Sequence, residues 1–177
     1  MTLTTDFAIT IVDYPAKRLA GFRTQTTVPA ASHDCSPLWR KFHSETKKRP
    51  DWRRKKSYGL FVRPNQSISL DFWTALEIAS DIPVPEGMEI FELSSGKFVH
   101  CLIPNAADIL MAYHTVYSIW IQSQNAYDID MESACFELYP PRWTPNDAFD
   151  LYVPLKTKEQ ERNKENDFET SINEGHL

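Results

Sequence analysis

The chain has 177 residues, of which 42% are hydrophobic and 12% aromatic, and its formal net charge is −5. This composition is sufficient for the core of one compact domain and excludes wholesale disorder. The negative charge, together with only five glycines and no glycine-rich phosphate-binding motif, argues against a general nucleic-acid binder and the common nucleotide-binding folds.

Neither a metal nor a cofactor is expected. Cys35, Cys101 and Cys135 lie far apart and form no C-x-x-C pair, and the histidines share no metal-ligand spacing. No basic segment followed by an apolar run opens the chain, and no apolar stretch reaches 18 residues. We therefore expect a cytoplasmic protein that makes no contact with a membrane.

The first half of the chain is predicted to contain four strands and one helix. Apolar and β-branched runs predict strands over residues 7–12, 18–26, 58–62 and 70–78. The helix is predicted to begin at Ser36-Pro37, because serine caps a helix N-terminus and proline loses nothing at the first helical position. Two prolines indicate a linker over 81–87.

The second half repeats this order of elements. Residues 88–93 and 97–103 are expected to form a hairpin, and apolar residues at i, i+3 and i+4 spacing predict a helix over about 106–122. The closing strands are predicted over 135–139 and 149–155. The remaining residues, 157–177, are polar and charged and are predicted to form a flexible tail.

Local matches between the halves predict a duplicated α+β fold. Y-G-L-F at 58–61 aligns with F-E-L-Y at 136–139. We predict a domain over 1–156, with pseudo-repeats at about 7–80 and 88–156. Each repeat is a strand–helix–strand–strand module opened by one further strand, and the antiparallel sheets leave a central ligand cleft between them.

Strand alternation separates the side chains of the last two strands into two sets. Phe136 and Leu138 fall on one face, while Glu137 and Tyr139 fall on the other. If the apolar residues of both strands pack beneath the helix, Tyr152 shares the face of Glu137. Two interpretations of Glu137 stay open: a solvated carboxylate, or a carboxylate recessed among aromatic rings and compensated by a ligand cation.

Several motifs, in this order and spacing, resemble the GyrI-like effector-binding family. They include I-V-D-Y-P-A-K-R-L-A-G at 11–21, Y-G-L at 58–60, F-E-L-Y at 136–139 and D-L-Y-V-P-L at 150–155. The family contains the ligand domains of AraC- and MerR-type multidrug-responsive activators, and integron-associated effector-binding proteins. The resemblance covers about 7–156.

The resemblance implies a central cleft with one buried glutamate ringed by aromatic side chains. Glu137 matches that glutamate, Tyr152 matches a pocket tyrosine of the final strand, and Tyr113 matches an aromatic residue on the second helix. The segment A-L-E-I at 75–78 departs from the family, where a glycine-containing stretch is common. The predicted ligand-binding residues are Glu137, Tyr139, Tyr152, Tyr113, Tyr117, Trp39, Phe61 and Trp73.

For two of these residues and for the basic run, an interpretation without a ligand also stays open. Trp39 and Tyr117 also fit a purely structural role in packing a helix on the sheet. The basic run K-K-R-P-D-W-R-R-K-K at 47–56 fits either a solvated loop or a contact with an acidic protein or nucleic acid.

The leading functional hypothesis is a stand-alone sensor or sequestering protein for hydrophobic or cationic small molecules. Direct DNA binding is not expected, because no helix-turn-helix accompanies the domain. One alternative is a hydrolase of cyclopropane-bearing genotoxic electrophiles, with Glu137 as the catalytic residue that activates water. Another is a gyrase-interacting inhibitor that uses the basic loop. The oligomeric state is left open.

Overall fold

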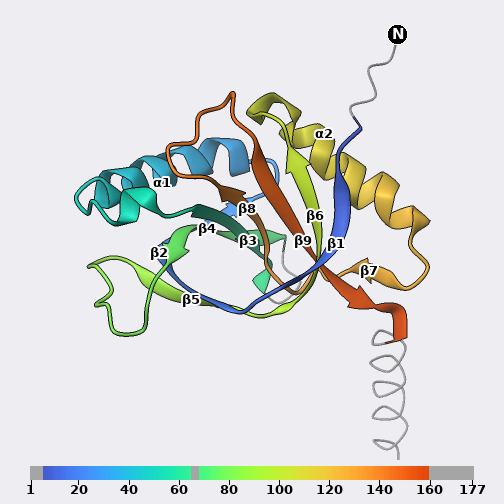
Figure 1. Cartoon of the computed structure of the whole chain (residues 1–177), viewed down its shortest axis with the longest axis horizontal. Coiled ribbons are helices and arrows are strands. Elements are labelled where there is room, and N and C mark those ends of the chain that lie inside the picture. Colours follow the sequence, from blue (N-terminus) through green and yellow to red (C-terminus); the bar gives the residue numbers. More distant parts are fainter. Residues whose placement is uncertain (1–5, 65–67, 160–177) are drawn as a thin grey trace, which may run out of the picture.

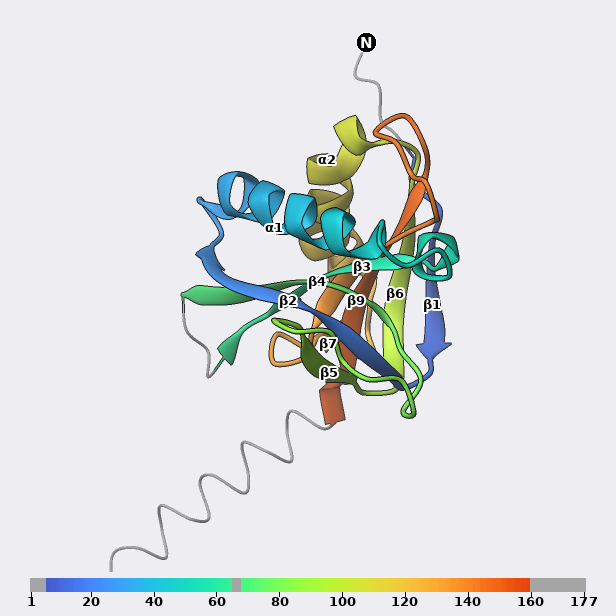
Figure 2. The same cartoon turned by 90° about the vertical axis from the view of Figure 1, so that its left-hand side faces the viewer.

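The structure is a computed structural model that describes residues 6–64 and 68–159. Of the predicted polar tail over 157–177, only residues 157–159 lie within the described part. One antiparallel sheet of nine strands forms the body of the molecule, and two long helical segments lie over the same face of it (Figures 1 and 2).

The elements follow the predicted order, with a 3-10 helix over 52–54 and a strand over 127–129 in addition to those predicted. They are β1 (Ile9–Tyr14), β2 (Lys17–Thr27), α1 (Ala31–Thr46), the 3-10 helix η1 (Trp52–Arg54), β3 (Ser57–Val62), β4 (Ser69–Glu77), β5 (Glu89–Leu93), β6 (Gly96–Ile103), the 3-10 helix η3 (Ala106–Asp108), α2 (Ile109–His114), the π-helix η4 (Thr115–Ile119), the 3-10 helix η5 (Trp120–Ser123), β7 (Tyr127–Ile129), β8 (Cys135–Tyr139) and β9 (Phe149–Thr157).

The strand order confirms the α+β duplication. Across the sheet the order is β1-β6-β9-β8-β3-β4-β2-β5, with β7 added beside β9. Each strand of the first half has its counterpart at the mirrored position of the second, with β3 and β8 side by side at the centre. The two halves are therefore related by an approximate two-fold axis between β3 and β8.

The pairing of the opening strands differs from the prediction. β5 and β6 were expected to form a hairpin, but β5 pairs with β2 and β6 pairs with β1 and β9. The first strand of each half therefore completes the sheet of the other half. Alternation identifies strands but carries no information about which strand pairs with which. The exchange of the opening strands is therefore determined by tertiary contacts.

The position predicted for the groove, between two separate sheets, is also wrong. β3 and β8 pair from Ser57↔Tyr139 to Phe61↔Cys135, so the two halves share one continuous sheet. The cleft lies instead above the centre of this sheet, lined by residues of α1 and of the segment that contains α2. These two helical segments lie over the same face of the sheet (Figure 1).

Helix α1 begins five residues earlier than predicted. The turn before it runs directly into the helix, because the amide of Ala30 bonds to the carbonyl of Thr27 and the amides of His33 and Asp34 bond to that of Ala30, each at 3.0 Å. Pro37 therefore lies inside the helix, not at its first position. Its pyrrolidine nitrogen cannot donate to the preceding turn, so the second turn of this helix lacks one backbone hydrogen bond.

The second helical segment follows the predicted range but not one regular geometry. It passes from the short helix α2 into the π-helix η4 and then into η5. A π-helical turn inserts an extra residue into the helical repeat and is common at functional sites. Here it lies between Tyr113 and the end of the segment, beside the cleft.

Both faces of the central strands are buried. On the helix face, one apolar cluster lies under α2 and includes Val116 and Leu151, and another lies under α1 and includes Phe42. On the opposite face a third cluster gathers around Phe136. The central side chains of β3 and β8, at 58–60 and 136–138, are therefore buried whichever way they point. No helix of the described residues is long and apolar enough to cross a membrane.

Candidate functional site

A cavity of about 610 Å³ lies between α1 and α2, above the centre of the sheet. Side chains from both helices, from the central strands and from the loop before β8 enclose it. The lining residues are Val28, Ala31, Ser32, Cys35, Trp39, Phe61, Arg63, Leu70, Phe72, Ile109, Leu110, Tyr113, His114, Tyr117, Asp130, Met131, Ser133, Cys135 and Glu137. We call it the Glu137 cavity.

Glu137 lies on β8 at the floor of this cavity, with only 6% of its surface exposed. Directly opposite, across the β3–β8 pair, is Gly59. A Cβ atom at Gly59 would lie 3.1 Å from the Trp39 ring and 3.6 Å from Oε2 of Glu137. The missing side chain thus lets the Trp39 indole lie close to the sheet beside the carboxylate.

Two tyrosines hold the Glu137 carboxylate. The hydroxyl of Tyr113, on α2, donates to Oε1 at 2.8 Å, and the hydroxyl of Tyr139 donates to Oε2. Burial raises the pKa of Glu137 above its usual value, and these two hydrogen bonds partly offset that rise by stabilising the ionised form. The carboxylate is therefore fixed in place but poorly solvated.

Within the described part of the chain, Glu137 forms no ion pair. None of the ion pairs formed among residues 6–64 and 68–159 includes its carboxylate. A buried carboxylate without a counter-charge is costly, because neutral hydrogen bonds replace only part of its lost hydration. The site can therefore gain free energy when a positive charge enters the cavity.

Aromatic rings form much of the cavity wall. Tyr113 and Tyr117 stack with their ring centroids 6.1 Å apart, and Phe61 stands beside Phe72 at 4.9 Å. Trp39 closes the side nearest α1. Such faces attract a cation through their quadrupole and offer apolar surface to an organic group.

The structure brings together most of the predicted site residues. Five of the eight line the Glu137 cavity: Glu137, Tyr113, Tyr117, Trp39 and Phe61. Tyr139 reaches the carboxylate from a neighbouring cavity. Their part in binding a ligand stays a prediction.

Tyr152 and Trp73 lie outside the Glu137 cavity, and the prediction that Tyr152 shares the face of Glu137 is wrong. Tyr152 pairs with Phe136 across β8 and β9, so it shares the face of Phe136 and not that of Glu137. Trp73 reaches the same opposite face, because it pairs with Leu60 and Leu60 pairs with Phe136. Both belong to the cluster on that side, where Tyr152 stacks on Phe136 at 4.9 Å.

The reason for this error is that the apolar residues of β8 and β9 do not share one face. Leu151 lies under α2 beside Glu137, whereas Phe136 points to the other side. Alternation sorted the side chains of each strand correctly, but the relation between two strands depends on their register. With both faces buried, the apolar pattern gives no hint of that register.

Sequence analysis missed two cysteines of the cavity. Cys135 is two residues from Glu137 on the same strand, so alternation was sufficient to find it, whereas Cys35 escaped because the helix was predicted to begin after it. Burial raises the pKa of the Cys35 thiol to about 12 and that of Cys135 to about 11, with the charge of Glu137 contributing to both. Both thiols are therefore protonated at neutral pH.

Metal binding has no support in the described part of the chain, where no three His, Cys, Asp or Glu side chains gather around one point. The fold is a duplicated α+β sheet, and the cleft over its centre is lined by aromatic rings and by the buried Glu137. The sequence matches the integron-associated effector-binding proteins over residues 10–155, and the chain belongs to that family.

Solved structures share this fold. An integron cassette protein from the mobile metagenome of Vibrio cholerae superimposes with a TM-score of 0.65 at 18% identity, covering 85% of this chain and 97% of its own. SAV2435, solved with tetraphenylphosphonium, gives 0.66 at 16% identity, with 84% and 94% covered. A putative transcription regulation protein from Staphylococcus aureus MU50 gives 0.60 at 16% identity, with 85% and 98% covered. No curated protein matches the sequence significantly.

The raised pKa of Glu137 predicts an effect on stability. The folded state binds this proton more tightly than the unfolded state, so stability is lost as pH rises from the unfolded pKa through the raised folded value. Glu137→Gln removes that loss and should raise the free energy of unfolding at pH 7 by about 1 kcal/mol.

The gain should shrink toward zero below about pH 4, where the wild-type carboxyl is protonated in both states. Urea unfolding of both proteins across this range measures the difference. A variant that is less stable than the wild type at pH 7 would contradict this account of the buried carboxylate.

Proposed function

We propose that this domain binds lipophilic organic cations in the Glu137 cavity and acts as a sensor or sequestering protein for them. The observation that carries the proposal is the Glu137 carboxylate, which is 6% exposed and bonded to two tyrosine hydroxyls but has no cationic partner in the described chain. A guest cation would supply the missing counter-charge.

The mouth of the cavity supports a lipophilic guest. Leu110 is 80% exposed, Val28 63% and Met131 48%, and all three line the cavity. Exposed apolar side chains around a concave site are typical of ligand-binding surfaces. An aromatic or alkyl group would cover this rim while its charge lies near Glu137.

The contacts of the tyrosines favour binding over hydrolysis. A hydrolase of the kind considered above needs a hydroxyl that donates to the developing oxyanion of the substrate. The hydroxyls of Tyr113 and Tyr139 already donate to Glu137. The two cavity thiols are protonated and so are poor nucleophiles.

Two ions of nearly the same shape and opposite charge test the proposal directly. We expect tetraphenylphosphonium to bind the protein at least 100-fold more tightly than tetraphenylborate, because only the cation compensates Glu137. Isothermal titration calorimetry of the full chain with each ion measures this ratio. The structure of SAV2435 with tetraphenylphosphonium supports the choice of probe.

Shape and apolar area are matched in this pair, so the ratio reports the sign of the charge. Equal affinities would show that the cavity selects only for hydrophobicity and would overturn the proposed function. Tighter binding of the borate would overturn it as well.

A further inference from the structure

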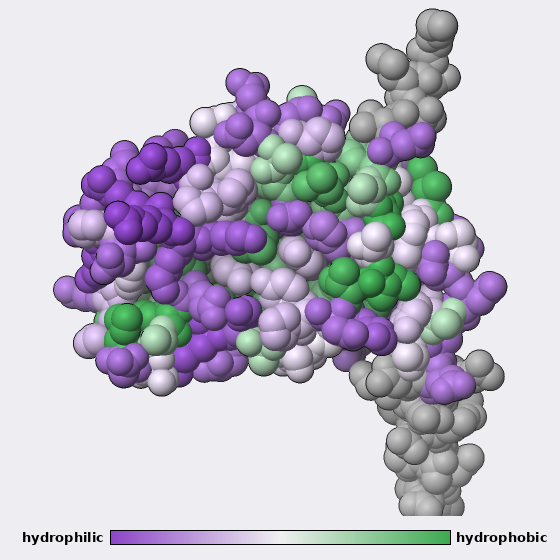
Figure 3. Space-filling view, viewed as in Figure 1, coloured by the Kyte–Doolittle hydropathy of each residue, from purple (hydrophilic) through white to green (hydrophobic). Residues whose placement is uncertain are grey.

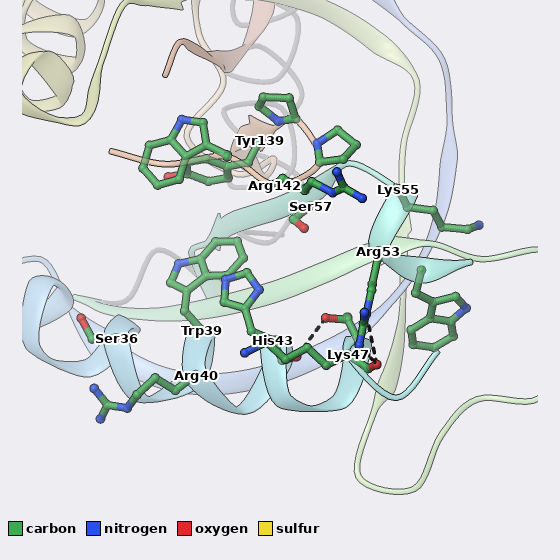
Figure 4. Close-up of a pocket in the computed structure, with 15 residues that line it drawn as sticks. Ser36, Trp39, Arg40, His43, Lys47, Arg53, Lys55, Ser57, Tyr139 and Arg142 are labelled. Carbon is green, nitrogen blue, oxygen red and sulfur yellow. Dashed lines mark hydrogen bonds between the residues drawn. The ribbon is translucent and has the colours of Figure 1, made fainter. Parts of the chain in front are cut away.

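A second cavity, of about 690 Å³, lies on the other side of Trp39 (Figure 4). It is enclosed by α1, by η1 and the segment after it, and by the loop that follows β8. Trp39 lines both cavities, and Tyr139 lines the second while its hydroxyl bonds to Glu137. The two rings meet edge to face at 5.4 Å and form the wall between the cavities.

This second cavity is basic although the whole chain is acidic. Five lysine or arginine side chains line it and no carboxylate does, so we call it the basic cavity; they are Arg40, Lys47, Arg53, Lys55 and Arg142. Figure 3 shows hydrophilic residues gathered over α1 and the loop after it. In a chain of net charge −5, such one-sided lining creates a local positive potential that attracts anions.

The positive charges are held in different ways. Arg53 donates to the backbone carbonyl of Lys47 at 2.6 and 3.1 Å, and Lys55 donates to that of Glu77 at 2.8 Å, so both are tethered without being neutralised. Arg142 and Lys47 form no side-chain ion pair with any other described residue. Their charges are available to a ligand.

Aromatic faces accompany these charges. Tyr139 lies between Trp39 and Trp143, at 5.4 and 4.7 Å, and the indole nitrogen of Trp143 donates to the carbonyl of Asp147 at 2.9 Å. His43 stacks on Trp39 at 5.6 Å. Figure 4 shows Trp39 and His43 extending from α1 toward Tyr139 and Arg142 across the cavity. The aromatic wall is thus formed before any ligand arrives, which reduces the entropy cost of binding.

The backbone at Arg142 adds an independent observation. Arg142 is the one non-glycine residue of the described chain with positive φ, at 60°. It is the third residue of a turn closed by the amide of Trp143 and the carbonyl of Pro140 at 3.3 Å, a position that favours glycine or asparagine. An arginine there is conformationally unfavourable, which points to a role for its side chain.

We propose that the basic cavity is a second ligand site, for a planar organic anion such as an aromatic phosphate, sulfonate or carboxylate. Arg142 and Lys47 bind the anionic group, and the ring of the ligand packs against Trp39, His43 and Trp143. This site does not depend on the cation site on the other side of Trp39, and it gives the basic loop at 47–56 a role in binding a small molecule.

Calorimetry of the full chain with three probes separates the contributions of ring and charge. 2-Naphthyl phosphate has both, 2-naphthol has only the ring and inorganic phosphate has only the charge. We expect one molecule of 2-naphthyl phosphate to bind per chain. Its affinity should be at least 10-fold higher than that of 2-naphthol or of inorganic phosphate. Equal binding of inorganic phosphate, or no binding of 2-naphthyl phosphate, would overturn the proposal.

Variants locate the site. Arg142→Asn keeps a residue that tolerates positive φ, so the fold should survive, and the affinity for 2-naphthyl phosphate should fall about 10-fold. Lys41→Gln is the control for the loss of one positive charge, because Lys41 lies on α1, which borders the cavity, but its ammonium lies over the Phe22 ring outside the cavity. An affinity that is insensitive to Arg142→Asn, or lowered equally by Lys41→Gln, would overturn the site.

The test of the basic cavity can fail or succeed independently of the proposed cation binding in the Glu137 cavity. Glu137→Gln removes the charge of the cation site but leaves the basic cavity intact, so it should not weaken 2-naphthyl phosphate. Polyglutamate tests the remaining possibility of an acidic polymer. Binding of polyglutamate without binding of the small anion would show that the basic loop is a macromolecular contact and would refute the small-molecule site.

Discussion

Replacing Glu137 with glutamine is expected to weaken the binding of tetraphenylphosphonium about 100-fold, or roughly 2.7 kcal/mol. The substitution keeps the shape of the side chain, and the amide can still hydrogen-bond to Tyr113 and Tyr139. It removes only the negative charge of the carboxylate, which forms no ion pair with any other described residue. Calorimetry with the cation measures the loss.

Glu92→Gln is the control for net charge. Glu92 lies on the edge strand β5, where its side chain is 65% exposed and paired with Arg18 at 3.2 Å. Its removal should change the affinity for the cation less than twofold, because an exposed and distant charge is screened. Equal losses in both variants would mean that the cation responds to the overall charge of the protein, and Glu137 would lose its role.

The second large effect is on folding. Gly21→Ala is expected to lower the free energy of unfolding by about 3 kcal/mol. A Cβ atom at Gly21 would lie 2.2 Å from the backbone oxygen of Thr74 and 2.7 Å from Cβ of Ala75. The obstacle is the backbone of β4, which pairs with β2 along its whole length, so the two strands must separate to admit the methyl group.

Gly96→Ala supplies the matched control for this variant. Gly96 opens β6, and a Cβ atom there would meet nothing closer than the Phe98 ring at 4.0 Å. Urea unfolding should show a change of less than about 1 kcal/mol. If Gly21→Ala were as harmless as Gly96→Ala, the close approach of β2 to β4 would be refuted.

Glu137 brings the requirements of folding and binding into conflict. The same substitution is expected to stabilise the empty protein and to weaken its binding of a cation. A residue that costs stability and recovers it only with a ligand is typical of a binding site. Measuring both quantities on one variant therefore separates a functional carboxylate from one that merely packs.

Local pattern was sufficient for most of the strands and for the duplication, whereas Glu137 was selected by its match to the family motif, because alternation left its role open. Alternation and short apolar runs identify β8 and β9, since a strand alternates its side chains whatever lies beside it. The motifs at 58–60, 136–139 and 150–155 carried the family. Cys135 was within reach of the same argument, two residues before Glu137.

Tertiary structure decided which of these side chains meet. Tyr152 looked like a partner of Glu137 along the sequence, but the register of β8 and β9 places it on the opposite face. Because both faces of the central sheet are buried, an apolar pattern could not show which face lies under the helices. The hydrogen bond from Tyr113, 24 residues away, depends on how α2 crosses that face.

Long-range pairing likewise shaped the rest of the molecule. β1 and β5 each complete the other half of the sheet, and the basic run at 47–56 returns beside α1 to line a cavity with Arg142. The sequence by itself determined most of the elements and the repeat, because these follow from neighbours along the chain, and the family motif at 136–139 selected the acidic residue. Only the fold decided the partners of each strand and the walls of each cavity, because such contacts join residues that no local pattern connects.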